Sequence, residues 1–378
     1  MIYLDNAATT EVAPEVIEEM TSYLKSNYGN PSSKYYEQAE NAKKYLEKSR
    51  EKIAQFINVD SDEIIFTSGS TESNNFVLKG LYDINDKSNH IITSKVEHKS
   101  VLKTCEYLEK KGCRVTYLDV NEYGQINIDQ LEEAISEETF LVSIIWANNE
   151  LGSLNQISEI SQICKKNNVK FHTDATQIFG KISIDLKDID VDFMSFTAHK
   201  IHGPKGIGAL YIKNDEIGLK PEIEPLIHGG NQEDDLRAGT QSMHNIVGFA
   251  KAIDLIDQSM SKNMSKIISL EDKMIKTLKS NFPNVIFNSN LDHKVPGIIS
   301  FSIPNLQNEL FLNMIKKEFA ISTGSACNIR EPSYVLKAIG GIDKQHNTLR
   351  VSISHYNDES ILDLANLIEK YLEKYDLD

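Results

Sequence analysis

Short apolar runs alternate with amphipathic stretches from residue 14 to residue 212. The runs lie at 64–67, 90–94, 113–118, 140–146, 169–173, 191–197 and 207–212. Short runs bounded by polar turns are typical of buried strands. Elsewhere apolar residues recur every three or four positions, which predicts helices at 14–24, 39–57, 72–78, 101–108, 128–136 and 156–166. Strands that alternate with helices predict an α/β fold with a mainly parallel central sheet flanked by helices.

The pattern changes after residue 243. A helical stretch covers 243–278, too long for one ordinary helix and polar around 258–266, which predicts a change of domain there. Strands at 298–303 and 348–353, with helices at 308–317, 333–339 and the C-terminus, predict a smaller α+β domain. We therefore expect a large domain at 13–255, and a small domain made of 1–12 and 256–378 that carries the Cys327 loop.

Composition and charge narrow the functional classes. The formal net charge of -15 argues against direct nucleic-acid binding, which depends on clustered Lys and Arg. No apolar run approaches the ~20 residues that span a bilayer, and the N-terminus lacks a basic segment followed by an apolar one. We therefore expect a cytoplasmic protein that does not enter the membrane. The cysteines show no metal-ligand spacing, and Cys105, Cys113 and Cys164 occupy apolar positions that predict a place in the core.

Polar motifs follow five of the predicted strands. They are Ser68–Thr71, Val96–His98, Ala147–Glu150, Asp174–Gln177 and Thr197–Lys200. Ligands of parallel sheets bind at the carboxyl ends of the strands, so these motifs are expected to meet. Lys200 alone would more often be a solvated loop lysine, but this convergence favours a functional role.

The chemistry of these residues points to one cofactor. The Ser68–Thr71 loop could bind a phosphate at a helix N-terminus or only cap the helix, and Asp174 could hold a cation or cap a turn. His98 could be a satisfied buried histidine or a ring stacked on a flat ligand. Pyridoxal phosphate is held by a phosphate site, a carboxylate, an aromatic ring and a lysine together, and these are the groups found here. No G-x-G-x-x-G motif supports a nicotinamide cofactor, and no His or Cys pair supports zinc.

Ordered motifs extend this interpretation to a family. They are YLDNAATT, GNPSS, FTSGSTESNN, VEHKSV, ANNELG, HTDATQ, AHKIHGPKGIGALY, STGSAC, EPSYVLKAIG and LRVSIS. In this order they resemble the motifs of cysteine desulfurases, within the class V aminotransferase-like, fold-type I pyridoxal-phosphate enzymes. The resemblance covers residues 3 to about 356.

The resemblance implies a role for each matching residue. Lys200 would be the Schiff-base lysine, and Asp174 would face the pyridine nitrogen of the cofactor. Gln177 would face the phenolic oxygen, and His98 would stack on the ring. Cys327 would take the sulfur. Phosphate-binding positions would be Ser70, Thr71, Thr197 and His199, with Thr240 reaching the phosphate of the other subunit of a homodimer, and substrate-carboxylate positions would be Asn149 and Arg350.

The implied activity is the conversion of L-cysteine to L-alanine through a persulfide on Cys327. The sulfur would pass to an acceptor protein, either an iron-sulfur scaffold or a tRNA-thiolating enzyme. Two alternatives stay open: a selenocysteine lyase or cysteine-conjugate lyase, which would not depend on Cys327, and a weakly active docking subunit of a sulfur-transfer complex.

The chain departs from the family pattern at several places. Lys34–Gln38 replaces the usual histidine and glycine after GNPSS, and the segment from Cys327 to Glu331 looks short. His355 stands where many relatives have arginine. Asn231 and Asp235 replace glycines and Ala238 replaces a serine; Asn and Asp tolerate a left-handed backbone, so we expect the turns to persist. Asp235 would add a negative charge near the phosphate.

Overall fold

The computed structural model describes residues 1–85, 89–324 and 333–375. Within these ranges the largest sheet has seven strands in the order β2-β8-β7-β6-β5-β3-β4. Strand β8 runs antiparallel to both of its neighbours, and the remaining pairs are parallel. The strands are β2 (Ile64–Thr67), β3 (His90–Ser94), β4 (Arg114–Leu118), β5 (Thr139–Ser143), β6 (Lys170–Asp174), β7 (Phe193–Thr197) and β8 (Gly208–Ile212). The predicted α/β fold with a mainly parallel sheet is therefore confirmed.

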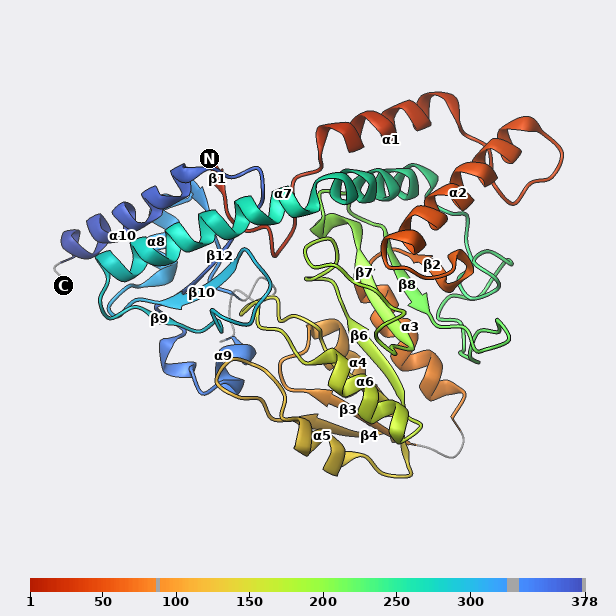
Figure 1. Cartoon of the computed structure of the whole chain (residues 1–378), viewed down its shortest axis with the longest axis horizontal. Helices are drawn as coiled ribbons and strands as arrows, with labels where there is room; N and C mark the ends of the chain where they lie inside the picture. The colour runs from red at the N-terminus through yellow and green to blue at the C-terminus, as the bar shows by residue number, and fades with distance from the viewer. Residues whose placement is uncertain (86–88, 325–332, 376–378) are drawn as a thin grey trace.

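Helices cover both faces of this sheet, as Figure 1 shows. Successive residues of a strand point to opposite faces. On β7, Met194 and Phe196 join the largest apolar cluster, whereas Phe193 joins a second cluster with residues of α3 and α4. The helices are α1 (Pro14–Ser26), α2 (Glu37–Phe56), α3 (Ser70–Asp83), α4 (Lys99–Glu109), α5 (Ile128–Ala134), α6 (Ile157–Lys166) and α7 (Met243–Asn281), with a 3-10 turn at Ser61–Glu63.

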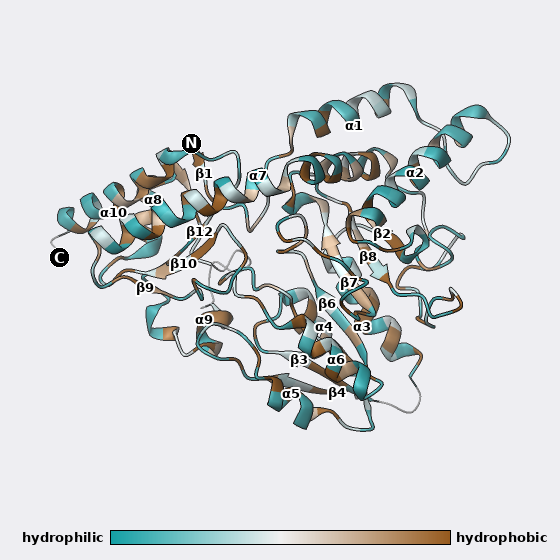
Figure 2. Ribbon diagram, viewed as in Figure 1, coloured by the Kyte–Doolittle hydropathy of each residue, from teal (hydrophilic) through white to brown (hydrophobic). Residues whose placement is uncertain are grey.

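Helix α7 is a single element of 39 residues, so the expectation that this stretch is too long for one helix is wrong. Its first half packs Ile246, Phe249 and Ile253 into the cluster of the large sheet. Its second half packs Leu270 and Met274 into a separate cluster around the smaller sheet. The polar middle of the helix spans the change from one core to the other, which Figure 2 shows as teal between the brown patches. The boundary at 255 and 256 stays a prediction.

The C-terminal part is an α+β unit. In the described ranges it holds an antiparallel sheet β12-β10-β9, and a two-stranded parallel pair in which β1 joins the N-terminus to β11. Both chain ends lie on this side of the molecule (Figure 1). The elements are β1 (Ile2–Tyr3), β9 (Ile286–Phe287), β10 (Ile298–Ser302), α8 (Asn308–Ile315), β11 (Phe319–Ala320), α9 (Tyr334–Ala338), β12 (Thr348–Ser352) and α10 (Asp363–Lys374), with 3-10 turns at Ile342–Lys344 and Glu359–Leu362.

Element boundaries differ from the sequence predictions by a few residues. Helix α3 begins at Ser70 rather than Glu72, so the small polar residues belong to its first turn. Strand β5 ends at Ser143 rather than at 146, although the next three residues are also buried. The two-residue strands β9 and β11 were not predicted, because so short a pair shows no periodicity.

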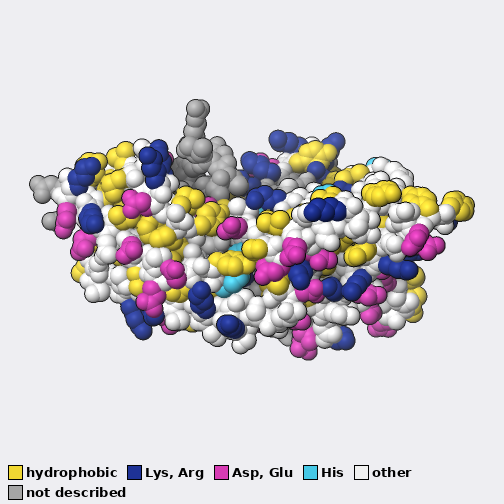
Figure 3. Space-filling view, turned by 90° about the horizontal axis from the view of Figure 1, so that it is seen from above, with side chains coloured by type: hydrophobic (Ala, Val, Ile, Leu, Met, Phe, Trp, Pro, Cys, Tyr) yellow, Lys and Arg dark blue, Asp and Glu magenta, His cyan; other side chains and the backbone are white. Residues whose placement is uncertain are grey.

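The surface carries both signs of charge. Figure 3 shows acidic and basic side chains interspersed over the face seen from above. Among the described residues, no helix is long and apolar enough to cross a membrane.

Candidate active site

The carboxyl ends of the parallel strands open into a cavity of about 490 Å³. It receives side chains from the ends of the sheet strands, from the N-terminal segment and from β12. The strand-end motifs therefore meet, as predicted. The predicted residues that line the cavity are Ser70, Thr71, His98, Asn149, Asp174, Gln177, Thr197, His199, Lys200 and Arg350.

Two predicted residues are not placed in the cavity. Thr240 is exposed and does not line it. Cys327 lies outside the described residues. Their roles stay predictions.

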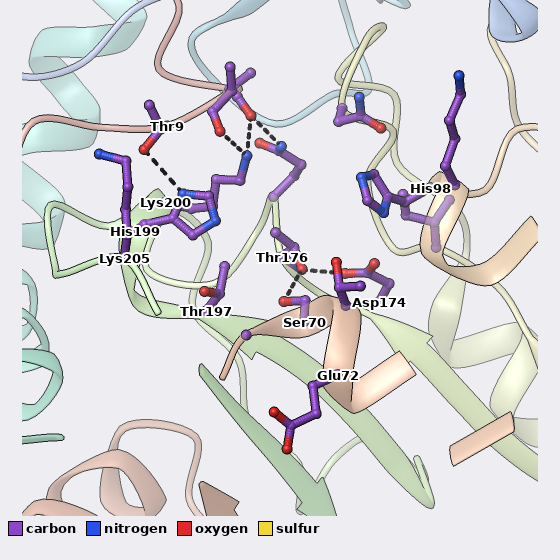
Figure 4. Close-up of a pocket in the computed structure, with 18 of the residues that line it drawn as sticks. Thr9, Ser70, Glu72, His98, Asp174, Thr176, Thr197, His199, Lys200 and Lys205 are labelled. Atoms are coloured by element: carbon purple, nitrogen blue, oxygen red, sulfur yellow. Dashed lines mark hydrogen bonds between the residues drawn. The ribbon is translucent and has the colours of Figure 1, made fainter. Parts of the chain in front are cut away.

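Lys200 follows β7 in a 3-10 turn, Ala198–Lys200. Its Nζ donates hydrogen bonds of 2.6 Å to the carbonyl oxygens of Ala7 and of Ala8. Gln177 Nε2 donates to the same Ala7 oxygen at 2.9 Å. The N-terminal segment thus supplies backbone acceptors that hold the lysine in the cavity, on the side opposite His98 in Figure 4.

The first turn of α3 offers donors to an anion. Helices leave their first N–H groups without intrahelical partners, and among the described residues no acceptor is bonded to the N–H of Ser70 or Thr71. The Ser70 hydroxyl accepts a 2.6 Å hydrogen bond from Thr176. A Cβ on Gly208 of β8 would lie 2.7 Å from Gly69 Cα, so only glycine lets this loop pack against the sheet. The unbonded donors and the helix dipole of this turn suit an anion such as a phosphate.

Glu72 puts a carboxylate in the same turn. In Figure 4 its carboxylate points away from Lys200, and its Oε1 accepts a 2.9 Å hydrogen bond from Arg237 Nε. Burial raises the pKa of Glu72, but hydrogen bonds from Arg237 and from Ser68 outweigh it and lower the pKa. Arg237 thus neutralises the acidic group nearest to the anion site.

Asp174 ends β6 and is 3% exposed. A carboxylate buried to this degree needs donors, and it accepts from Asn74 Nδ2 at 2.8 Å and from the Thr176 N–H at 3.0 Å. Asn74 Nδ2 also donates to Ser100 Oγ at 2.8 Å, and Ser100 Oγ lies 2.8 Å from His98 Nδ1. One polar chain therefore joins the carboxylate to the imidazole on the other side of the cavity.

His98 is held as a neutral ring. It is the N-cap of α4, and its Nδ1 accepts from the Ser100 N–H at 3.2 Å. Burial lowers the pKa of His98; the charge of Asp174 opposes this shift, and the charges of Lys200 and Lys99 add to it. With Nδ1 as acceptor, the ring proton lies on Nε2.

Arg350 brings a buried guanidinium to the cavity from β12 and is 1% exposed. Nη1 donates to the carbonyl oxygens of Asn149 at 2.9 Å and Gly324 at 3.1 Å, and Nη2 donates to Asp5 Oδ1 at 2.5 Å. Nε is buried and has no partner among the described residues. Two of the five N–H donors of the guanidinium are thus left for a ligand.

Two buried glutamates lie beside these groups. Burial, with a smaller contribution from the charge of Asp174, raises the pKa of Glu97 to about 8. Burial also raises the pKa of Glu150, which lines the cavity and accepts 2.6 Å from Ser333 Oγ. Both carboxyls are therefore biased toward the neutral form.

Three cysteines are far from reactive. Cys105, Cys113 and Cys164 are buried in apolar clusters, which confirms the prediction of core positions. Burial raises the pKa of all three thiols, to about 11 for Cys113 and about 12 for Cys164. A thiol needs its thiolate to act as a nucleophile, so these three are inert at neutral pH.

Asp235 adopts a left-handed backbone with φ +67°, as expected for an aspartate that replaces a glycine. Glu233 and Asp234 are also left-handed, which the sequence did not indicate, whereas Asn231 is not among the positive-φ residues. His355 packs its ring against His202 and Tyr356 at centroid distances of 4.9 Å and 4.2 Å.

Sequence reasoning missed the supporting residues. Asn74 and Ser100 connect Asp174 to His98, and Thr176 bonds Ser70. A weak signal existed, because each is a small polar residue within four positions of a predicted site residue. Which partner each would find depends on how the strand ends are juxtaposed.

The donor set fits pyridoxal phosphate. Asp174 would offer a carboxylate to the pyridine nitrogen, the first turn of α3 would offer N–H groups to the phosphate, and Lys200 would offer the amine. A mainly parallel sheet with these groups at one edge defines a fold-type I pyridoxal-phosphate enzyme.

Comparisons with known proteins agree with this class. The profile of the family described as Aminotransferase class-V matches residues 2–364. The chain is 42% identical over 369 residues to "Cysteine desulfurase IscS" of Clostridium botulinum strain Kyoto, covering 96% of this chain and 91% of that protein. It is 42% identical over 379 residues to the protein of the same name from Dictyoglomus turgidum, covering 99% and 95%.

Solved structures give the same answer. A "NifS-like protein" superposes with a TM-score of 0.91 at 36% identity, covering 99% of both chains. "SspA in complex with cysteine" superposes with a TM-score of 0.83 at 36% identity, covering 95% of this chain and 100% of that one. The chain belongs to the cysteine desulfurase family of class-V aminotransferases, which depend on pyridoxal phosphate.

Proposed function

We propose that this protein is a cytoplasmic, homodimeric cysteine desulfurase that converts L-cysteine to L-alanine and donates the sulfur to an acceptor protein. The observation that carries the proposal is the cavity in which Lys200, Asp174 and Arg350 meet, in a chain 42% identical to proteins named as cysteine desulfurases. Iron-sulfur cluster assembly and tRNA thiolation are the two uses of the sulfur that we propose.

Arg350 binds the substrate carboxylate in this proposal. Its two remaining N–H donors match the two oxygens of a carboxylate. Asn149 lines the cavity beside it, and its side-chain amide N–H can donate to the carboxylate. These groups orient the amino acid so that its Cα faces Lys200.

The cofactor, when bound, withdraws electrons from the substrate Cα. Asp174 holds the pyridine nitrogen protonated for this purpose, and the Asn74 and Thr176 donors fix the carboxylate in place. The neutral Lys200 nitrogen then accepts the Cα proton and later returns a proton to the substrate.

Cys327 completes the reaction. Its thiolate attacks the substrate sulfur, an S–S bond forms and the C–S bond breaks, and the electron pair of that bond stays with the substrate carbon. Protonation of this carbon gives alanine, and the sulfur remains on Cys327 as a persulfide. The inert state of Cys105, Cys113 and Cys164 supports assigning this step to Cys327.

The homodimer is proposed from Thr240. This residue is exposed and outside its own cavity, which leaves its hydroxyl available to the phosphate of a second subunit. The Arg237–Glu72 ion pair ties the loop that carries Thr240 to α3.

The deciding experiment is the mass of the holoenzyme after incubation with L-cysteine, followed by peptide mapping. We expect one added sulfur on Cys327 and an equal amount of alanine. Lys200→Ala should lose the visible cofactor band, and Cys327→Ala should keep the band and lose alanine formation from cysteine. Full turnover by Cys327→Ala would refute the mechanism, and its turnover of selenocysteine alone would favour a selenocysteine lyase.

The activity of the isolated dimer tests the alternative that the protein is a weakly active docking subunit. Robust alanine formation without added proteins contradicts that alternative, and a rate that rises only with an acceptor protein supports it.

A further inference from the structure

A second cavity of about 40 Å³ is shared by Lys200 and Lys181. Lys181 lies four residues after Gln177, in the turns that follow β6. The other titratable residues that line this cavity are His202 and His355, and none of its described lining residues is Asp or Glu. Two lysines thus line one small space whose described lining holds no carboxylate.

The contacts of Lys181 connect it to the active site. Its Nζ donates to Gln177 Oε1 at 3.4 Å, and Gln177 Nε2 donates to the Ala7 oxygen that also accepts from Lys200. Within the part of the chain that the structure describes, no carboxylate forms an ion pair with Lys181. Burial, together with the charges of Lys200 and Arg350, lowers its pKa to about 7.

Lys181 is half-buried. A half-buried ammonium that has no carboxylate partner among the described residues is costly, since burial penalises the charged form. Lys181 lies beside Lys200, the predicted nucleophile. A neighbouring cation is one of the ways in which proteins activate lysine nucleophiles.

We propose that Lys181 is a positioning residue for Lys200 and Gln177. Its charge disfavours a proton on the Lys200 nitrogen, and its N–H holds Gln177 Oε1 so that the remaining amide N–H of Gln177 is directed to the cavity. The inference rests on the proposed function, which needs a neutral Lys200 nitrogen to hold the cofactor and to accept a proton from the substrate.

Other charged groups line the cavity that holds Lys200. In the larger cavity these are the bases Lys99, Lys205, Arg350, His98 and His199, and the acids Glu72, Glu150 and Asp174. They stay the same in wild type and in the variants below, so the Lys181 charge is the variable tested.

The test is a pH titration of the visible absorbance of the holoenzyme, which reports protonation of the cofactor-bound Lys200 nitrogen. Two unit charges about 10 Å apart at an effective dielectric constant of about 20 change a protonation equilibrium about tenfold. We therefore expect the midpoint to rise by about one pH unit in Lys181→Met and in Lys181→Gln. Lys181→Arg, which restores the charge, should titrate like wild type.

Lys110→Met is the matched control, because it removes the charge of an exposed lysine at the C-terminal end of α4. Its midpoint should equal that of wild type. Lys181→Met and Lys181→Gln are both measured, so that a folding defect in one of them does not prevent the test. A purely structural role would lower stability or cofactor content without moving the midpoint.

Equal midpoints in wild type, Lys181→Met and Lys181→Gln would overturn this inference, as would an equal shift in Lys181→Arg. The proposed function is judged separately by alanine formation in wild type. A wild-type holoenzyme that makes no alanine from cysteine refutes the function, whereas normal turnover with unmoved midpoints refutes only the role of Lys181.

Discussion

Replacement of Arg350 by lysine tests how the cavity recognises its substrate. The side chain is almost fully buried, and three of its five N–H donors are used by Asn149, Gly324 and Asp5. Lysine keeps the charge but offers a point contact instead of a planar fork. The Arg350→Lys variant therefore loses the two-point grip on a carboxylate while the cavity stays cationic.

The size of the effect follows from the two donors that remain. A hydrogen bond between charged partners contributes about 1.5–3 kcal/mol. Loss of one such bond raises KM for L-cysteine by roughly 10- to 150-fold, because 1.4 kcal/mol corresponds to tenfold. We expect kcat to change by less than about threefold, since the carboxylate contact is the same in the ground state and in the transition state.

The assay is the initial rate of alanine formation at saturating cofactor, with cofactor content measured by absorbance. Asp5→Asn is the control, because it removes the negative charge beside Nη2 and keeps the guanidinium. A KM within threefold of wild type in Arg350→Lys, at full cofactor content, would refute the reasoning. A collapse of kcat at unchanged KM would place Arg350 in the chemical step instead.

Three further predictions concern the surrounding scaffold. Glu233→Gln should lower the free energy of unfolding in urea by about 3–5 kcal/mol, because it leaves Arg50 buried without its ion-pair partner; a wild-type midpoint would contradict this. Gly208→Ala should weaken cofactor binding about tenfold or more, measured by equilibrium titration, because the new Cβ would lie 2.7 Å from Gly69 Cα and displace the phosphate loop. Burial lowers the pKa of His90 to about 4. On acidification from about pH 6.5 the unfolded chain therefore binds a proton that the folded chain does not bind, so the free energy of unfolding falls. His90→Gln should flatten this acid slope by about one proton, and an unchanged slope would show that His90 is protonated when folded.

The order of elements could be read from the sequence because each is a local property. Period-two and period-3.6 patterns located the sheet strands and most helices, and the polar residues after each strand located the edge at which they meet. Glu233 and Asp234 could not be foreseen in a left-handed backbone, because that conformation is held by contacts distant in sequence. Glu233 accepts from Arg50 and from the Phe66 N–H.

The sequence by itself determined the fold class, the cofactor and the family, and it predicted that Lys200 and Asp174 meet at one edge of the sheet. These depend on residue types at the ends of strands, and a parallel sheet brings such ends together whatever the details of packing. Only the tertiary structure decided how the groups are held: the Ala7 and Ala8 carbonyls at Lys200, and the Asn74 bridge to Asp174.

The proximity of Lys181 to Lys200 is likewise a result of the tertiary structure. Burial and charge proximity are properties of the assembled core, so an ordinary-looking lysine acquires its electrostatic role only when segments distant in the chain enclose it.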